Sequence, residues 1–89
     1  GIKRDTMKHI ILADGVNWID KKPAKKTFKG NAKIRYGSEA ALARLTSLDK
    51  GKVRIEFTEA QSSPTPGQAV VIYRKDTVLG GGWIRNVEG

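Results

Sequence analysis

Residues 52–59 read Lys-Val-Arg-Ile-Glu-Phe-Thr-Glu, with apolar side chains at Val53, Ile55 and Phe57 and polar side chains between them. Successive side chains of a β-strand point to opposite faces, so this period of two predicts a strand with one buried face. An Asp49-Lys50-Gly51 turn precedes it, which indicates that the chain folds back at this point. This stretch therefore favours a β protein.

Other segments, outward from this strand, carry the same alternation or a short apolar run. We expect strands at residues 7–12, 16–19, 28–36, 69–74 and 77–84. The Asp14-Gly15 pair between the first two favours a hairpin turn. Pro64, Pro66 and Gly67 predict a loop that leaves the sheet, and Lys75-Asp76 predicts a turn.

The segment 38–48 has two interpretations. Ser38 is a possible helix cap, Leu42, Leu45 and Leu48 recur at a spacing of three, and alanine favours a helix. Intrinsic propensity alone therefore predicts a helix over residues 40–48. The alternative is a hairpin between residues 41 and 59, closed by the Asp49-Lys50-Gly51 turn.

The fold class follows from the number of short strands. Six strands in one open layer would expose two edges, whereas closure into a barrel removes both edges and encloses a core. We therefore predict an all-β fold, a small closed antiparallel β-barrel of about six strands. At 89 residues the chain has room for one domain, which we place at residues 7–89, with residues 1–6 a linker or an expression remnant. Gly80, Gly81 and Gly82 indicate a bulge, a barrel corner or close backbone packing.

Net charge indicates the class of partner. The chain has 17 Lys and Arg against 9 Asp and Glu, a net charge of +8 and a pI near 10.1, which suits a polyanion such as nucleic acid. No basic amphipathic helix or long apolar run is present, so we expect no membrane partner. The candidate RNA-binding residues are seven cations over fifteen positions without an acid: Lys21, Lys22, Lys25, Lys26, Lys29, Lys33 and Arg35. The alternative is a solvated surface that keeps a small domain soluble.

Residues that could carry chemistry are few. The chain has no cysteine, which is compatible with the reducing cytoplasm where we expect the protein, and its single His9 lacks the partners of a metal site or triad. The glycine triplet is followed by Trp83 and Ile84, not by the Lys and Ser or Thr of a nucleotide loop. We therefore expect no catalytic, cofactor or metal site. The aromatic residues are expected in the core, with Trp18 and Tyr36 left open: Trp18, Phe28, Tyr36, Phe57, Tyr73 and Trp83.

Several stretches resemble bacterial tRNA-specific 2-thiouridylases. The C-terminal end of that family is similar to Glu59-Ala60-Gln61, to Thr65-Pro66-Gly67-Gln68-Ala69-Val70-Val71 with Tyr73, and to Val78-Leu79-Gly80-Gly81-Gly82 with Ile84. Upstream, Asn17-Trp18 and Ala32-Lys33-Ile34-Arg35-Tyr36 resemble family elements in the same order. The chain differs from the family at Ser62 and at Gly37-Ser38, where the family usually has Arg and Arg-Gln.

The resemblance implies a C-terminal accessory β-barrel of a larger enzyme, in which the segment 40–48 is a strand. It implies that the parent enzyme uses ATP to adenylate the wobble uridine of tRNA and replaces an oxygen with sulfur, with its nucleotide loop and catalytic cysteines in preceding domains. The implied partners are tRNA, the other domains of the parent and a sulfur-donor protein. Two alternatives remain, a structural lid or domain-interface module without RNA contact, and a free-standing basic RNA-binding barrel.

Overall fold

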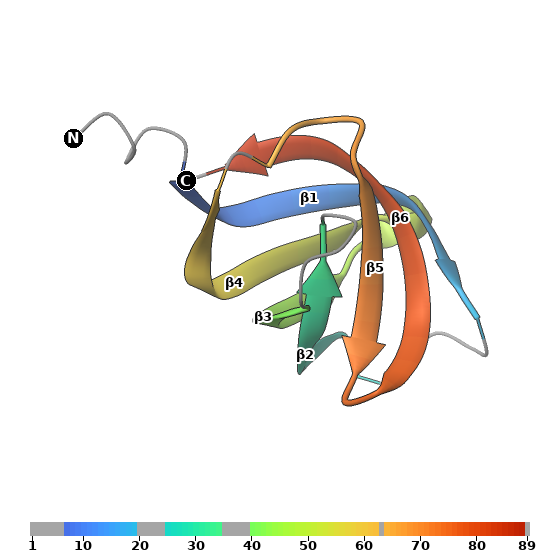
Figure 1. Cartoon of the computed structure of the whole chain (residues 1–89). Helices are drawn as coiled ribbons and strands as arrows, with labels where there is room; N and C mark the ends of the chain where they lie inside the picture. The colour runs from blue at the N-terminus through green and yellow to red at the C-terminus, as the bar shows by residue number, and fades with distance from the viewer. Residues whose placement is uncertain (1–6, 20–24, 35–39, 63, 89) are drawn as a thin grey trace.

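The chain folds into a closed six-stranded antiparallel β-barrel, as predicted (Figure 1). The computed structural model describes residues 7–19, 25–34, 40–62 and 64–88. The strand order around the barrel is β1-β4-β3-β2-β5-β6. The strands are β1 (Met7–Trp18), β2 (Thr27–Lys33), β3 (Ala41–Ser47), β4 (Val53–Ser62), β5 (Ala69–Arg74) and β6 (Thr77–Glu88), with a 3-10 turn, η2, at Asp49–Gly51. The predicted linker at residues 1–6 lies outside the described residues.

The inner faces of the strands form one core, which confirms the alternation read from the sequence. Val53, Ile55 and Phe57 on β4 are at most 2% exposed, while Arg54 and Glu56 between them lie on the outer side. Each fully buried aliphatic side chain of this kind contributes about 1.5–3 kcal/mol of transfer free energy. The core is made of Ile11, Ala13, Phe28, Ala32, Ile34, Ala43, Leu45, Val53, Ile55, Phe57, Val70, Ile72 and Ile84.

The hairpin expected at Asp14-Gly15 is wrong, because residues 7–18 form one continuous strand. β1 pairs with β6 on both sides of Gly15, and the register between them shifts between Asp14 and Asn17. Gly15 has a φ of 60°, and glycine adopts this conformation readily both in hairpin turns and in bulges. The local sequence is thus compatible with either, and the continuous pairing to β6 selects the bulge.

The helix expected from propensity over residues 40–48 is also wrong, and the hairpin alternative is confirmed. β3 pairs antiparallel with β4, with Ala43 opposite Phe57 and Leu45 opposite Ile55. A spacing of three places Leu42 and Leu45 on opposite faces of a strand. Accordingly, Leu45 is fully buried in the core, whereas Leu42 is 54% exposed on the outer surface.

The glycine triplet in β6 lets three strands approach closely, as predicted. Gly80 and Gly81 pair with β1 on one side and with β5 on the other. A Cβ on Gly82 would lie 2.6 Å from the carbonyl oxygen of Asp14, and one on Gly80 would overlap the backbone carbonyl of Asn17. Backbone atoms occupy the space that a side chain would need at these positions, which explains why they are glycines.

The aromatic residues divide between the core and the surface. Phe28 and Phe57 are buried, as expected, and Trp18 is half-buried with its ring centroid 6.4 Å from that of Phe28. The expected burial of Trp83 is wrong, since this side chain is 58% exposed on β6. Tyr73 is half-buried and lies outside the core cluster, and Tyr36 lies outside the described residues.

The expected turns are present in the described part of the chain. Residues 64–68 form the loop between β4 and β5, and Lys75-Asp76 forms the turn between β5 and β6, with Lys75 at a φ of 55°. None of the helices in the described part of the chain is both long and apolar enough to cross a membrane.

Candidate nucleic-acid interface

The predicted basic residues that the structure describes follow one strand. Lys25 and Lys26 are exposed immediately before β2, Lys29 is exposed on β2, and Lys33 is half-buried at its end. The remaining predicted residues, Lys21, Lys22 and Arg35, lie outside the described residues. The described cations therefore form a row along the outer surface rather than a scattered set.

Alternation along β2 explains why these lysines face outward. Phe28 and Ala32 are buried in the barrel, so Lys29, Asn31 and Lys33 between and after them take the outer face. None of the residues that the structure describes between 25 and 34 is acidic. This outer face of β2 thus has uncompensated positive charge along the strand.

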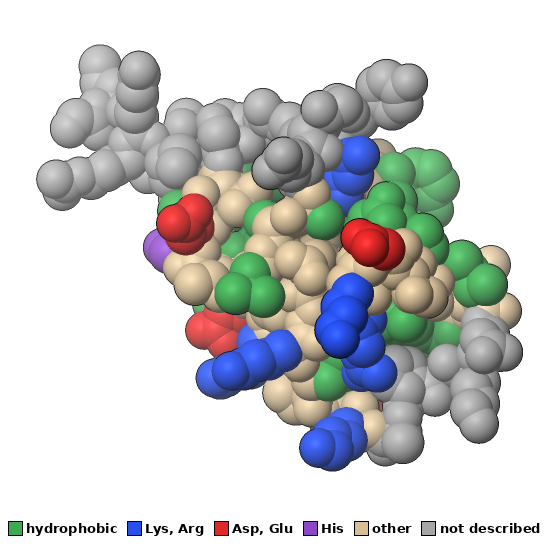
Figure 2. All heavy atoms as spheres, turned by 60° about the horizontal axis from the view of Figure 1, so that its bottom comes forward, with side chains coloured by type: hydrophobic (Ala, Val, Ile, Leu, Met, Phe, Trp, Pro, Cys, Tyr) green, Lys and Arg blue, Asp and Glu red, His purple; other side chains and the backbone are tan. Residues whose placement is uncertain are grey.

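The barrel brings a further cation to this row that sequence reasoning missed. Arg44 on β3 lies directly opposite Lys29 in the register of β2 and β3. On the other side of β2, Tyr73 and Val71 of β5 lie opposite Asn31 and Lys33. Figure 2 shows Lys and Arg side chains spread over one side of the molecule, with apolar side chains between them and a few carboxylates. We name the set Lys29, Asn31, Lys33, Arg44, Val71 and Tyr73 the basic face.

The end of the barrel next to the basic face is held by backbone and aromatic contacts. The N–H of Ser47 donates to the carbonyl oxygen of Lys26 at 2.7 Å, which ties the chain before β2 to the end of β3. The guanidinium carbon of Arg74 lies 5.2 Å from the ring centroid of Phe28, a cation–π distance. Lys26 and Arg74 thus extend the positive charge from the face toward this end.

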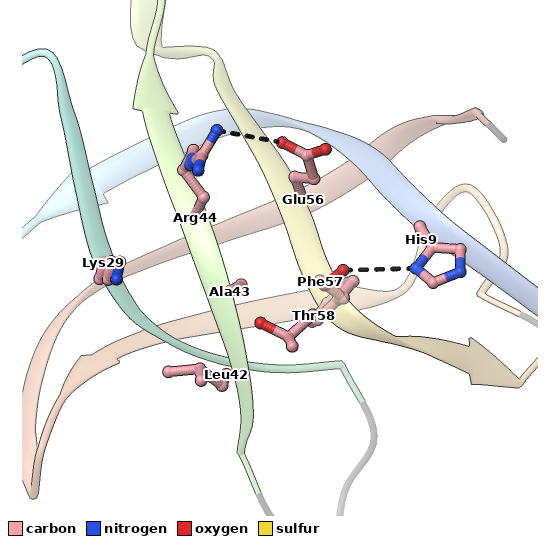
Figure 3. A pocket seen from close by; sticks show the side chains of 8 residues that line it. All are labelled: His9, Lys29, Leu42, Ala43, Arg44, Glu56, Phe57 and Thr58. Carbon is pink, nitrogen blue, oxygen red and sulfur yellow. Dashed lines mark hydrogen bonds and ion pairs between the residues drawn. The ribbon is translucent and has the colours of Figure 1, made fainter.

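A groove lies beside the basic face on the outer side of β3 and β4 (Figure 3). Its floor is the Ala43–Phe57 pair, whose side chains point into the core and leave the outer surface without side chains at that position. The groove has a volume of about 570 Å³ and is lined by His9, Lys29, Leu42, Ala43, Arg44, Glu56, Phe57 and Thr58.

An irregularity in the pairing of β1 with β4 brings His9 to the groove. The register between β1 and β4 shifts between Lys8 and Ile10, on either side of His9. Between these two pairs His9 faces four residues of β4, residues 57–60, so the regular ladder is interrupted beside its side chain. The Nδ1 of His9 lies 3.4 Å from the carbonyl oxygen of Phe57, so the ring lies across β4 at the edge of the groove. His9 is exposed on its strand.

The charges at the groove are only loosely paired. The Nη1 of Arg44 lies 4.0 Å from an Oε1 of Glu56, and the Nη1 of Arg54 lies 3.9 Å from the same oxygen. All three side chains are at least 41% exposed, and such surface pairs contribute about 0–1 kcal/mol. Arg44 is therefore free to turn toward an incoming anion at small cost.

The structure brings together no constellation for catalysis in the part of the chain it describes. No group of three or more His, Cys, Asp or Glu side chains that could hold a metal occurs among those residues. Every buried side-chain nitrogen and oxygen described has a hydrogen-bond partner. What this surface offers chemically is charge, hydrogen bonding and exposed apolar area.

A family comparison matches almost the whole barrel. The family model described as the aminomethyltransferase beta-barrel domain matches residues 8–84. In all, 411 curated proteins are similar to the chain. In the tRNA-specific 2-thiouridylases among them, the matching part is the C-terminal region. The resemblance noted from the sequence is thereby confirmed.

Three relatives illustrate the extent of the similarity. The tRNA-specific 2-thiouridylase MnmA of Chlorobium phaeovibrioides is 44% identical over 94% of this chain and 24% of that protein. The corresponding protein of Chlorobium chlorochromatii is 42% identical over 94% of this chain and 23% of its own length. That of Heliobacterium modesticaldum is 46% identical over 88% of this chain and 21% of its own length. The chain thus spans about a quarter of the length of these relatives.

Proposed function

This chain belongs to the family of the aminomethyltransferase beta-barrel domain, and from this we infer that it serves as the C-terminal accessory barrel of a tRNA-specific 2-thiouridylase. Its role is to help hold the tRNA while the parent enzyme carries out ATP-dependent 2-thiolation of the wobble uridine. The parent works in the cytoplasm, with a sulfur-donor protein as a further partner. The barrel itself supplies no reacting group.

The observation that carries this proposal is the row of cations on one strand. Two of these cations, Lys25 and Lys26, lie immediately before β2. Lys29 and Lys33 lie on β2 with no acid between them, and Arg44 lies opposite Lys29. A phosphate backbone releases counterions when such cations neutralise it, which favours binding to any RNA of suitable shape. Phosphate contacts position the nucleic acid and do not read its sequence. The basic face is therefore suited to holding a tRNA that the rest of the enzyme selects.

The test is the salt dependence of tRNA binding by the 89-residue chain. We expect the association constant to fall as salt rises, with a log-log slope of roughly −0.7 to −0.9 for each phosphate contact. Replacing Lys25, Lys26, Lys29 and Lys33 together by Ala should flatten that slope by about 3, the sum over four contacts. An unchanged slope in this variant would exclude these four lysines as phosphate contacts.

A second candidate function, a domain-interface module, is favoured by another surface. Trp83 is 58% exposed on β6, with the exposed Ala69 opposite it on β5. The charges nearby are balanced, because Arg85 pairs with Asp14 at 2.8 Å. Exposed tryptophan with neutral surroundings is typical of protein contacts rather than of phosphate contacts. The relatives have about three quarters of their length beyond the matched part, and this could cover Trp83.

The two candidates are compatible, because the cations of the basic face lie on β2 and β3, whereas Trp83 lies on β6. tRNA binding predicts that substitutions on β2 and β3 change the affinity for tRNA. A domain interface predicts that substitutions on β5 and β6 change the contact between domains. If tRNA in excess shifts no NMR resonance of the chain at low salt, the interface function alone remains.

A further inference from the structure

The groove over the Ala43–Phe57 pair differs from the rest of the basic face because its chemistry changes from one end to the other. In the register of the strands, Lys29 lies opposite Arg44, and Arg44 lies opposite Glu56. Two cations therefore lie toward the β2 side, whereas on the β4 side the carboxylate of Glu56 is partly balanced by Arg54, whose Nη1 lies 3.9 Å from it. A phosphate is attracted more strongly to the Lys29 and Arg44 end than to the Glu56 end.

Arg44 is suited to take part in such a contact. Its side chain is 63% exposed and its pairing with Glu56 is long, at 4.0 Å. A guanidinium forms two parallel hydrogen bonds to a phosphate, which are stronger than a surface ion pair at this distance. Arg44 is thus expected to leave the carboxylate of Glu56 and bind a phosphate instead.

The rest of the groove matches a nucleobase. Leu42 is 54% exposed and presents an apolar surface that can pack against the face of a base. The Thr58 hydroxyl and the ring of His9 lie across the groove from it, on β4 and β1 (Figure 3). These two side chains provide hydrogen-bonding groups for the edge of a base. The volume of about 570 Å³ lies within the range of small-ligand sites, about 300–1,000 Å³.

A peptide is a poorer occupant for the same groove. Extended peptides usually bind by adding a strand to an open sheet edge. β3 pairs with β2 and β4 along this stretch, with Gly30 and Phe57 on either side of Ala43, so β3 offers no open edge to an added strand. The cations at one end of the groove select for an anion.

We propose that this groove binds one unpaired nucleotide of RNA. Its phosphate lies between Lys29 and Arg44, and its base lies over Leu42 with its edge toward Thr58 and His9. The inference rests on the proposed RNA-binding function and adds to it, because the basic face alone requires only phosphates. A base splayed out of a loop meets this requirement, whereas a paired base in a stem does not.

The first test is an NMR titration of the isotopically labelled chain with uridine 5′-monophosphate, with inorganic phosphate as a separate arm. The nucleotide should shift the amides of residues 42–44 and 56–58, while phosphate should shift only the signals around Lys29 and Arg44. If both ligands give the same shifts, the groove binds an anion and not a nucleotide, and the proposal is wrong.

The second test compares variants in binding of a single-stranded RNA pentamer. Leu42→Ala should weaken binding by roughly threefold to tenfold, since it removes apolar surface that the base would bury. Val78→Ala is the matched control, because Val78 is also an exposed aliphatic residue but lies on β6 away from the groove. Equal affinities of these two variants would overturn the proposal.

Glu56→Gln tests the orientation of the nucleotide in the groove, with its phosphate away from the carboxylate. Removal of the carboxylate should strengthen pentamer binding by roughly twofold to threefold, because it no longer repels the phosphate or competes for Arg44. Weaker binding would mean that the carboxylate of Glu56 accepts a hydrogen bond from the base. That result would contradict the proposed position of the base over Leu42. If Lys29→Ala weakens binding but Leu42→Ala does not, the subsite fails and the basic face stands. If neither tRNA nor the pentamer binds, the proposed function itself fails.

Discussion

The carboxylate of Asp14 accepts a hydrogen bond from the guanidinium of Arg85 at 2.8 Å, although the two residues are 71 positions apart in the chain. Asp14 lies on β1 and Arg85 on β6, so the pair joins the first and last strands beside the bulge at Gly15. The backbone N–H of Gly15 donates to the other carboxylate oxygen at 2.8 Å. The Arg85 hydrogen bond, followed by that of Gly15, lowers the pKa of Asp14 below its ordinary value of 3.8.

Acid should weaken this link. The folded-state pKa of Asp14 is below the unfolded value, so the ionised carboxylate stabilises the barrel above pH 3.8 and loses this effect as pH falls through the folded-state pKa. Arg85→Gln removes the main cause and should raise the pKa of Asp14 toward 3.8. A carboxyl ¹³C titration by NMR measures the pKa of Asp14 in the unsubstituted chain and in the Arg85→Gln variant. The same pKa in both would contradict the assignment of Arg85 as the cause.

Leu45 and Leu42 on β3 form a matched pair for core packing. Leu45 is fully buried and Leu42 is 54% exposed. Leu45→Ala should lower the free energy of unfolding by about 2–5 kcal/mol through lost burial and a residual cavity. Leu42→Ala should change it by less than about 0.5 kcal/mol. Urea unfolding measures both, and similar losses would contradict the strand assignment of this segment.

Gly80→Ala should destabilise the barrel by about 3 kcal/mol or more, because the added Cβ meets the backbone carbonyl of Asn17 and no side-chain rotation relieves the overlap. Gly67→Ala is the comparison. Nothing lies within 4 Å of a Cβ there, but φ is 95°, so the cost is conformational and about 1–2 kcal/mol. Thermal and urea unfolding should rank Gly80→Ala as the more damaging change. The reverse order would show that β1 and β6 are not closely packed.

Lys29→Ala alone should reduce the steepness of the salt dependence of tRNA binding by about 0.7–0.9, the value of one phosphate contact. The matched control is Arg85→Gln, which removes a cation whose charge Asp14 already balances on β6. Fluorescence anisotropy at several salt concentrations gives both slopes. An equal change in the two variants would show that net charge, and not position, governs binding.

Trp83 reports on the second candidate function. In the isolated chain, acrylamide should quench Trp83 strongly, since its side chain is 58% exposed, and should quench the half-buried Trp18 less. Single-tryptophan variants, with Phe at the other position, separate the two signals. In the full-length parent protein, we expect Trp83 to be protected from quenching by the domain that covers it. Unchanged quenching there would exclude Trp83 from a domain interface.

The sequence alone was sufficient for the fold class, the strands with clear alternation and the basic row. Val53, Ile55 and Phe57 alternate with polar residues, and this period of two is a local property that burial of one face requires. The same local rule placed Lys29 and Lys33 on the outer face of β2. The resemblance to a known family corrected the helical propensity of residues 40–48, which tertiary pairing with β2 and β4 overrides.

Only the tertiary structure decided which residues are neighbours across strands. The register of β2 and β3 places Arg44 opposite Lys29. The irregular pairing of β1 with β4 places His9 near Phe57 and Leu42. No local pattern in the sequence reveals either neighbour. Asp14-Gly15 has the chemistry of both a hairpin turn and a bulge, and the choice depended on whether the chain continues along β6. Hydrogen bonding between distant strands and closure of the barrel are long-range events. Local sequence fixes the face on which a side chain lies, and only these events fix its neighbours.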